Sequence, residues 1–519
     1  MVFLSHSHLI AISILHLITW GYCLTLKGWV SDDIQGIAAF SDRFVQEKDA
    51  QGNIVKEYVI DSYDSDKKVK IKNTAWNHEL NFPSNLMRWF RLNWGKTFQS
   101  LGKDSKGHDQ YGWVQDARKH HALNILVQWA NLILGYNLIS HFFGPNLAFY
   151  SMLLFAVHPC GVQTVGWISG VNYCLSLLGA LLTFNCALYI SNPYILVPVI
   201  ALSSTLSCMT LLPGCFNAVI LLLMGFNNAA LISGIIGLLF FYKIGKETMN
   251  YRVSAFKEQQ MGKSTNFYWR KLIIMVKTFW YYVKMVLFPK RLGLFHVWGY
   301  HFEEPIEHID REFWFGLLSI TLYSLILLVA PAPVKIGLIW ALIYLSIFSN
   351  LITAQQFVSE RYAYISLFGL SLSVAYYLQN YPPVFTFILG IFLMRIWVHL
   401  PTFRNEVAFY ESNVFNFPNS EVAQGNLGVA YLNHGMGHKA IDTWMEASRQ
   451  NPLYDVPWYN LYSLAKQNGD ILSAKKYLTK CLNAKTIHFP EQWKKEMVEI
   501  DAIIAKAVSD GLIKVDPPK

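Results

Sequence analysis

Two adjacent carboxylates, Asp32 and Asp33, follow the first long apolar stretch of this 519-residue chain. A carboxylate at the boundary between membrane and water is partly desolvated, and a second carboxylate beside it favours the protonated form further. One of the pair could therefore act as a general base that takes a proton from a water-borne hydroxyl. Two plainer interpretations compete: the pair could open a solvated loop, or it could cap a short helix beginning at Ile34.

Four more polar residues border or interrupt apolar stretches. Glu360 and Arg361 open an apolar helix; an arginine facing a cavity can bind a phosphate through two hydrogen bonds, although charges at such helix ends commonly serve as interface anchors. Lys284 stands inside "WYYVKMVLF", where a cation must reach the interface or line a cavity. His158 ends a short helix, and a lone histidine in that place is more often a structural hydrogen-bonding partner.

Membrane helices are the elements that must position these residues. The chain is 53% hydrophobic and 15% charged, whereas soluble domains average about 25% charged residues. Apolar stretches long enough to cross a bilayer recur up to residue 400. We expect an all-α bundle of about eleven membrane helices, and the region 193–244 allows two crossings or three, of which we count two. The expected helices are 3–26, 120–142, 146–159, 170–191, 193–212, 224–244, 271–289, 312–330, 334–352, 359–379 and 383–400.

The distribution of charge predicts the orientation of this bundle. Eight basic residues and only two acidic ones lie between Lys243 and Lys277, so the positive-inside rule makes that segment cytoplasmic. The acid-rich loop "HFEEPIEHIDRE" should lie outside. The N-terminus is then cytoplasmic, whereas the first polar loop, 27–118, and the C-terminal domain are extracytoplasmic. The N-terminus lacks the basic region and cleavage site of a signal peptide, which indicates a retained helix.

Other features narrow the class of protein. The net charge of +9 is dispersed and forms no basic stripe, which argues against nucleic acid as a partner. None of the seven cysteines forms a CxxC pair, so a disulfide framework or a zinc site is not expected. No Asn-x-Ser/Thr sequon occurs, which favours the cytoplasmic membrane of a bacterium; in a eukaryote the corresponding location would be the endoplasmic reticulum membrane.

The first polar loop has two predictable parts. Alternating residues on both sides of a Gln-Gly-Asn turn at 51–53 indicate a small β-hairpin. Nearer its end, "SNLMRWFRLNWGKTF" places Leu86, Phe90 and Trp94 on one helical face. That helix could lie in the membrane interface, or it could form the core of a small loop domain.

The C-terminal domain, 404–519, follows the membrane domain, 1–403, and has a 34-residue period. The pattern matches tetratricopeptide repeats, with small residues where paired helices approach and large ones between pairs. Residues 404–418 resemble part of a preceding repeat, and 491–509 a capping helix. The matching positions are Leu427, Gly428, Tyr431, Ala440, Trp444, Ala447 and Pro452 from a start at Glu421, and Trp458, Leu461 and Ala474 from a start at Asp455.

The motifs of this chain occur in an order that resembles a known family, and the resemblance covers nearly the whole chain. "WVSDDIQGI" is followed by "KHHALNILVQWANLIL", "LFAVHPCGVQTVGWISG", "WYYVKMVLFPKRLGL", "SERYAYISLFG" and the repeats. The chain resembles the transmembrane and tetratricopeptide-repeat glycosyltransferases, which are similar to protein O-mannosyltransferases and have the GT-C fold. Residues 41–80 look like an insertion relative to that family.

The resemblance implies an inverting transfer of a sugar from a polyprenyl phosphate carrier to a protein hydroxyl. Asp32 or Asp33 would be the base, and Arg361 would bind the phosphate, with His158 or Lys284 as further ligands. His121 and Asn124 match the family's His-x-x-Asn helix, and Glu360 is another cavity candidate. The repeats would recruit the protein acceptor. No cofactor is firmly implied, although paired carboxylates could hold a divalent metal.

Several charged positions of that family are lost here, and the losses favour a different class of protein. A catalytically inactive membrane scaffold, whose repeats and outer loops bind partner proteins in a larger complex, is the alternative. An oligosaccharide ligase or polymerase of another fold explains the position of the Asp pair less well. The departures are Gly161 and Gln163 after His158, Val171, Asn172 and Tyr173 after "WISG", Cys208 after Ser207, and Gln128 at the end of the His-x-x-Asn helix.

Overall fold

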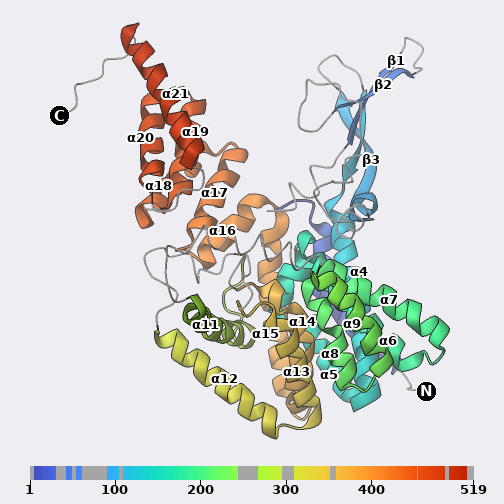
Figure 1. Ribbon diagram of the computed structural model, residues 1–519. Coiled ribbons are helices and arrows are strands. Elements are labelled where there is room, and N and C mark those ends of the chain that lie inside the picture. Colours follow the sequence, from blue (N-terminus) through green and yellow to red (C-terminus); the bar gives the residue numbers. More distant parts are fainter. Residues whose placement is uncertain are drawn as a thin grey trace. The chain divides into compact units, whose positions relative to one another are not determined.

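The computed structural model in Figure 1 divides the chain into two compact units. The first unit comprises 1–254, 265–292 and 307–406, and the second comprises 255–264, 293–306 and 407–519. Helices dominate both units, as predicted. The residues described by the structure are 5–30, 42–48, 54–60, 90–103, 109–242, 267–294, 309–350, 358–452, 454–484 and 490–510.

The first unit is a helical bundle, and every predicted membrane segment coincides with at least one of its helices. The bounds are α1 (His6–Trp20), α4 (Ala117–Phe143), α5 (Pro145–Ala156), α6 (Val171–Tyr189), α7 (Pro193–Thr210), α8 (Asn217–Leu223), α9 (Asn227–Phe240), α11 (Phe267–Leu287), α12 (Arg311–Val329), α13 (Ala332–Ser346), α14 (Glu360–Leu378) and α15 (Pro382–His399).

Six helices of the described chain are long and apolar enough to cross a membrane, so the chain fits a multi-pass membrane protein. A seventh span is obtained if α5 and the segment Pro159–Gly166, bent by 59° from each other, are counted together. The predicted number, eleven, is not reached. One reason is that α9 and α13, which coincide with predicted crossings, are short. The six are His6–Thr25, Ala117–Phe143, Ile168–Tyr189, Pro193–Thr210, Arg311–Val329 and Pro382–Arg404.

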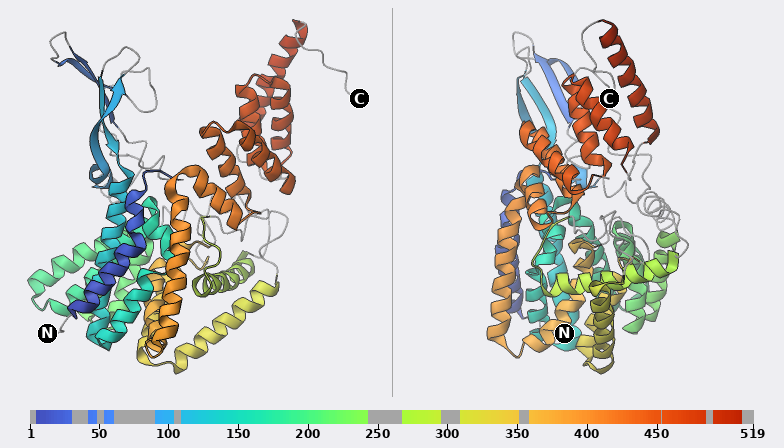
Figure 2. Two further views of the ribbon diagram at one scale, coloured as in Figure 1. Left: turned by 180° about the vertical axis from the view of Figure 1, so that it is seen from behind. Right: turned by 90° about the vertical axis from the view of Figure 1, so that its left-hand side faces the viewer.

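Helix α11 also differs from the predicted crossing at 271–289. It carries several basic residues along its length, which makes it too polar for a simple span. Figures 1 and 2 show α11 lying across the direction of α14 rather than along it. An amphipathic helix in that orientation is typical of a membrane interface. The inside and outside assignments that counted α11 as a crossing therefore stay predictions.

Helix α14 is the central helix of the bundle. Its side chains are buried along most of its length, and it packs against α5, α6, α11 and α13. The α13 and α14 backbones approach so closely that a Cβ at Gly369 would overlap the carbonyl of Gly337. Trp340 of α13 donates its indole N–H to the carbonyl of Ile365 at 2.9 Å. Small residues at a crossing and polar groups that bond across it are typical of helices packed in membranes.

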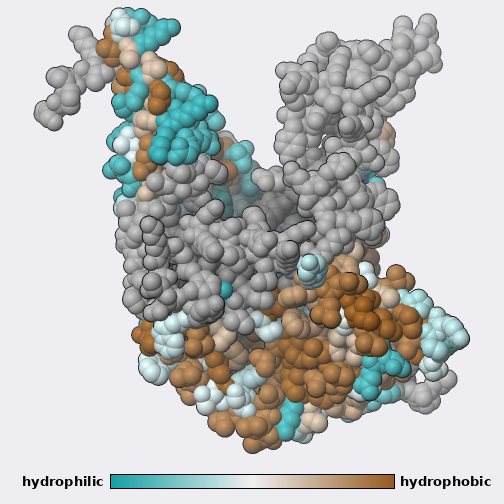
Figure 3. Space-filling model, in the orientation of Figure 1, coloured by the Kyte–Doolittle hydropathy of each residue, from teal (hydrophilic) through white to brown (hydrophobic). Residues whose placement is uncertain are grey.

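The outer helices expose apolar side chains. Gly316 is the buried residue of α12, whereas Leu328 and Val329 are 73% and 84% exposed. The space-filling view shows broad hydrophobic surface over the helices of this unit (Figure 3). Exposing so large an apolar surface to water is unfavourable, whereas contact with lipid is favourable.

The first polar loop contains a four-stranded antiparallel sheet in the order β2-β1-β4-β3. Strands β1 (Asp42–Lys48) and β2 (Ile54–Ile60) form the predicted hairpin around 51–53. Strands β3 (Lys96–Lys103) and β4 (Asp109–Gln115) were not predicted. The helix predicted over 84–98 ends at residue 95, where β3 follows.

The two ends of this loop meet at the bundle. Leu92, from the short helix at 90–95, packs with Ala117, Ile168 and Trp29. Phe90 and Trp94 are instead 42% and 39% exposed. Leu92 therefore forms the buried side of the short helix, whereas Phe90 and Trp94 of the predicted apolar face are exposed; Leu86, its third residue, lies outside the described residues.

The second unit consists mainly of paired helices: α16 (Glu406–Asn416), α17 (Glu421–Asn433), α18 (Gly437–Gln450), α19 (Asp455–Gln467), α20 (Ile471–Leu482) and α21 (Pro490–Ser509). The α17–α18 and α19–α20 pairs begin at Glu421 and Asp455, 34 residues apart. Gly428 allows α17 to approach the Trp444 indole of α18, which donates its N–H to the carbonyl of Gly425 at 3.0 Å.

Candidate functional site

The predicted site residues divide into those the structure describes and those it does not. Asp32 and Asp33 lie outside the described residues. The other candidates belong to the first unit, and those on α4 and α14 come together at the end of the bundle where α14 begins. The segment 158–170, which carries "HPCGVQTVGWISG", lies between these two helices and contacts both.

Arg361 is positioned at the first turn of α14 by aromatic rings and by Gln163. Its guanidinium carbon lies 5.2 Å from the centre of the Trp167 ring and 5.4 Å from that of Tyr362. The Gln163 side-chain oxygen accepts the backbone N–H of Arg361 at 3.4 Å and the hydroxyl of Ser359 at 2.8 Å. These contacts hold the start of α14 and place the guanidinium beside two aromatic rings. A guanidinium can form two parallel hydrogen bonds to a phosphate.

Trp167 connects this arginine with the segment that leads to the Asp pair. Its indole N–H donates to the carbonyl of Val30 at 3.4 Å, and its own carbonyl accepts the side-chain amide of Asn124 at 2.8 Å. Val30 is the last described residue before Asp32. Trp167 therefore bridges α4, α14 and the chain that leaves the first membrane helix. In the sequence, the only sign of this role is that Trp167 belongs to the quoted motif "LFAVHPCGVQTVGWISG".

His121 lies one helical turn before Asn124 on the same face of α4. It is 1% exposed. Within the described residues, neither of its ring nitrogens has a hydrogen-bonding partner. A buried imidazole of this kind is unusual because unpaired buried polar atoms cost free energy. The structure thus places Asn124 of the predicted His-x-x-Asn pair against Trp167 and gives it a positioning role.

The Tyr362 ring beside Arg361 belongs to an aromatic cluster. Phe348 and Tyr362 stack with ring centres 4.2 Å apart and planes 3° from parallel. Tyr173, one of the departures from the resembled family, lies 6.5 Å and 6.2 Å from these two rings. The three side chains are buried. Rings packed so closely keep water from part of the cation, which strengthens its attraction for an anion.

His158 has a structural environment. Its Nδ1 accepts the backbone N–H of Cys160 at 3.2 Å, so the ring proton is on Nε2, which donates to the carbonyl of Val286 at 3.1 Å. Both ring nitrogens are therefore engaged by backbone groups. This agrees with the plainer interpretation of His158 and leaves it poorly prepared to bind a phosphate.

Lys284 and Glu360 differ in exposure. The Lys284 ammonium lies 4.2 Å from the centre of the Tyr281 ring and 3.9 Å from a carboxylate oxygen of Glu312, and its side chain is 43% exposed. It is thus a surface cation of α11. Glu360 is 0% exposed at the start of α14. Its burial beside Arg361 makes it part of the wall of the site.

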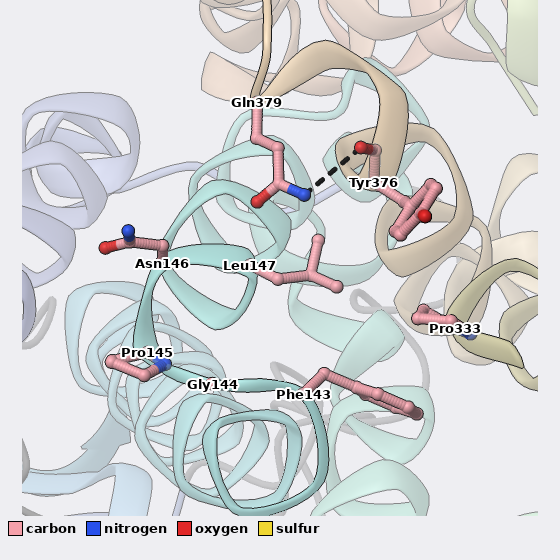
Figure 4. A pocket seen from close by; sticks show the side chains of 8 residues that line it. All are labelled: Phe143, Gly144, Pro145, Asn146, Leu147, Pro333, Tyr376 and Gln379. Carbon is pink, nitrogen blue, oxygen red and sulfur yellow. Dashed lines mark hydrogen bonds between the residues drawn. The ribbon is translucent and has the colours of Figure 1, made fainter. Parts of the chain in front are cut away.

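Two further observations concern possible metal ligands and a cavity elsewhere in the bundle. Among the described residues, no group of three or more His, Cys, Asp or Glu side chains could hold a metal ion. A cavity of about 330 Å³ lies at the turn between α4 and α5, around Gly144 and Pro145, and it has no charged lining residue. Figure 4 shows this cavity with Gln379 bonded to the backbone of Tyr376. Its lining contains no carboxylate, imidazole or ammonium group.

No protein family, curated protein or solved structure matches this chain. The fold and the site alone define its class: a helical bundle with several helices that could span a membrane, and an arginine set among aromatic rings at one end.

Proposed function

We propose that the protein is an integral-membrane glycosyltransferase of GT-C type that moves a sugar from a polyprenyl phosphate to a protein acceptor outside the cytoplasm. The observation that carries this proposal is the double role of Trp167. Its ring lies against Arg361, and its indole N–H reaches Val30, so the segment leading to Asp32 and Asp33 passes beside the cation.

Chain length supports the same conclusion. Asp32 is two residues beyond Val30 and Asp33 is three. Fully extended, two and three residues span at most about 7 and 11 Å. We therefore expect the carboxylates at the same end of the bundle as Arg361, and not at the opposite leaflet.

The proposed chemistry uses these groups in fixed roles. Arg361 would neutralise the carrier phosphate, which makes the phosphate an adequate leaving group. Asp32 or Asp33 would accept the proton of the acceptor hydroxyl as its oxygen attacks the sugar carbon from the opposite face. The new glycosidic bond forms as the bond to phosphate breaks, so the configuration inverts. His121 and Asn124 would line the site, and the mechanism requires no metal.

The second unit would bind the protein acceptor. We propose that its helix pairs are tetratricopeptide repeats, a view supported by the 34-residue spacing of the pairs and by the full burial of Ala440 and Ala474. Repeats of this kind present extended surfaces for peptides. They would hold an acceptor segment during transfer.

Glycan mass spectrometry of envelope proteins tests the enzyme. Cells carrying Asp32→Asn or Asp33→Asn, and the double variant, are compared with wild type. Asp116→Asn is the matched control, because asparagine also caps helices well and Asp116 caps α4. Loss of a glycan in at least one test variant, but not in the control, is expected. Unchanged glycans in all the variants would remove the enzyme hypothesis.

A scaffold remains the second candidate, because two departures from the resembled family have structural roles. Gln128 accepts the Tyr364 hydroxyl, and Gln163 accepts from Ser359. Both amides bond α14 or its cap to neighbouring elements inside the bundle, and a scaffold would need this packing even without transfer. The scaffold predicts a large membrane complex in native electrophoresis that disappears when 407–519 is deleted, together with unchanged glycans in the Asp variants.

A further inference from the structure

An apolar groove runs along α14 between α5, α15 and the turn that follows α11. Its volume is about 780 Å³, within the range of ligand-binding cavities. The floor is buried and consists of Leu154, His158, Leu367 and Ser371. The rims are exposed, with Phe288 at 73%, Ile391 at 47% and Met394 at 65%. The groove therefore opens sideways, toward the surface that lipid would cover.

The length of the groove suits one hydrocarbon chain. Leu367, Ser371, Val374 and Leu378 line it from α14 and recur with helical spacing on one face. Eleven residues separate the first from the last, which corresponds to about 16 Å at 1.5 Å per residue. Half of a hydrocarbon core of about 30 Å is nearly the same length. The groove thus matches the depth of a single leaflet.

Positive charge lies at one end of the groove. Lys290 and Arg395 are among its lining residues, and none of the lining residues is acidic. Arg395 donates to the carbonyls of Lys290 and Pro289 at 2.6 and 3.3 Å, which holds its guanidinium in place. A guanidinium has five N–H donors, so these two bonds leave others for an anion. Both cations are near the C-terminal end of α11, the helix that lies across the bundle.

We propose that this groove binds an anionic phospholipid of the surrounding bilayer, with an acyl chain along α14 and its phosphate at Lys290 and Arg395. Basic pockets between membrane helices bind lipid head groups by the same attraction. The argument uses the apolar floor, the one-leaflet length and the charge at one end. It does not rest on the transfer reaction, and Arg361 has no part in it.

Native mass spectrometry of the purified full-length protein tests the proposal. The protein is delipidated in mild detergent, and either phosphatidylglycerol or phosphatidylcholine with the same acyl chains is then added. We expect phosphatidylglycerol to remain bound at least fivefold more than phosphatidylcholine. Lys290→Gln should weaken its binding about fivefold. Arg118→Gln, which removes an exposed cation of α4 outside the groove, should leave binding unchanged.

Filling the groove gives the second test. Val374→Trp should abolish retention of phosphatidylglycerol, whereas Leu325→Trp, on the exposed surface of α12, should not. Thermal unfolding in detergent checks the fold of each variant, and Ile391→Trp on the opposite rim serves if Val374→Trp does not fold. Equal retention of both lipids by the wild type, or retention of phosphatidylglycerol by a folded groove-filling variant, would overturn the proposal. Transferase activity does not enter either readout.

Discussion

The cations of α11 and α14 are held in different ways. Lys277 of α11 is 1% exposed, and its ammonium lies 2.7 Å from Asp310, the residue that caps α12. Lys284, also on α11, lies near Glu312 of α12. Arg361 instead lies against Trp167 and Tyr362. The carboxylates lie on α12 and join it to α11, whereas the rings lie on the elements that surround the site.

The carboxylate contacts of Lys277 and Lys284 lead us to expect structural roles for these two charges. A carboxylate weakens the attraction of its cation for an incoming phosphate. An aromatic ring contacts the face of a guanidinium and orients its N–H groups, which lie in the guanidinium plane. On this view, changes at Arg361 should alter activity more than stability, and changes at Lys277 should do the reverse.

The largest expected effect is on transfer by Arg361 variants. Replacing Arg361 with Gln removes the proposed phosphate-binding charge, and we expect transfer to fall about 100-fold or more, as when a transition-state hydrogen-bond donor is lost. Arg361→Lys should recover only part, because lysine cannot form two parallel bonds. Glycan occupancy measured by mass spectrometry is the readout. Normal occupancy in Arg361→Gln would show that the charge of Arg361 is not needed for transfer.

Stability should respond most at the Lys277–Asp310 pair. Asp310→Asn keeps a cap for α12 but leaves a buried cation without this carboxylate, so unfolding should become easier by about 2 kcal/mol. Lys277→Met removes the charge as well and should cost less. Thermal unfolding in detergent measures both. A larger loss in Lys277→Met than in Asp310→Asn would show that the ion pair itself is not what stabilises this crossing.

Acid should weaken the same pair. Burial alone would raise the pKa of Asp310, but the hydrogen bonds from Lys277 and from the backbone of Phe313 outweigh it and hold the pKa below the ordinary 3.8. A pKa lowered by folding gives stability that is present above the unfolded value and is lost as pH falls through the folded one. Wild type should therefore lose stability below pH 3.8 more steeply than Asp310→Asn. Parallel pH curves would contradict this.

The smallest effect is expected at Lys284. Its partner Glu312 is 3.9 Å away, and the side chains are 43% and 24% exposed. Ion pairs with this degree of exposure contribute under about 1 kcal/mol. Lys284→Gln should leave thermal unfolding nearly unchanged and should leave transfer intact. A marked loss of transfer would instead return Lys284 to the phosphate-binding candidates and make α11 part of the site.

The sequence predicted the helices of the bundle well, because a long apolar stretch is a strong and local signal. It also predicted the β1–β2 hairpin from a Gly-containing turn between alternating residues. It could not predict that α11 lies across the bundle, since its aromatic and aliphatic residues conceal a two-sided helix. Strands β3 and β4 were missed because Gly102 and Gly112 interrupt their alternation.

The candidate site was less predictable than the fold. The side chains of Arg361, His121 and Asn124 stand out by type, but the bond from Trp167 to Val30 joins residues 137 positions apart. The structural role of His158 depends on the carbonyl of Val286, which belongs to a distant helix. Contacts of that range depend on how the helices pack, and no local pattern encodes them.

One hydrophobic cluster bears on which changes in loop length the chain can tolerate. It is formed by Trp29, Leu92, Ala117 and Ile168. The two ends of the first polar loop are held together by this cluster, so packing in the bundle already offsets the conformational entropy lost when the loop is closed. Lengthening a closed loop adds little further entropy cost. The sheet-bearing segment can therefore be enlarged, shortened or exchanged for another module while the helices beneath it keep their packing.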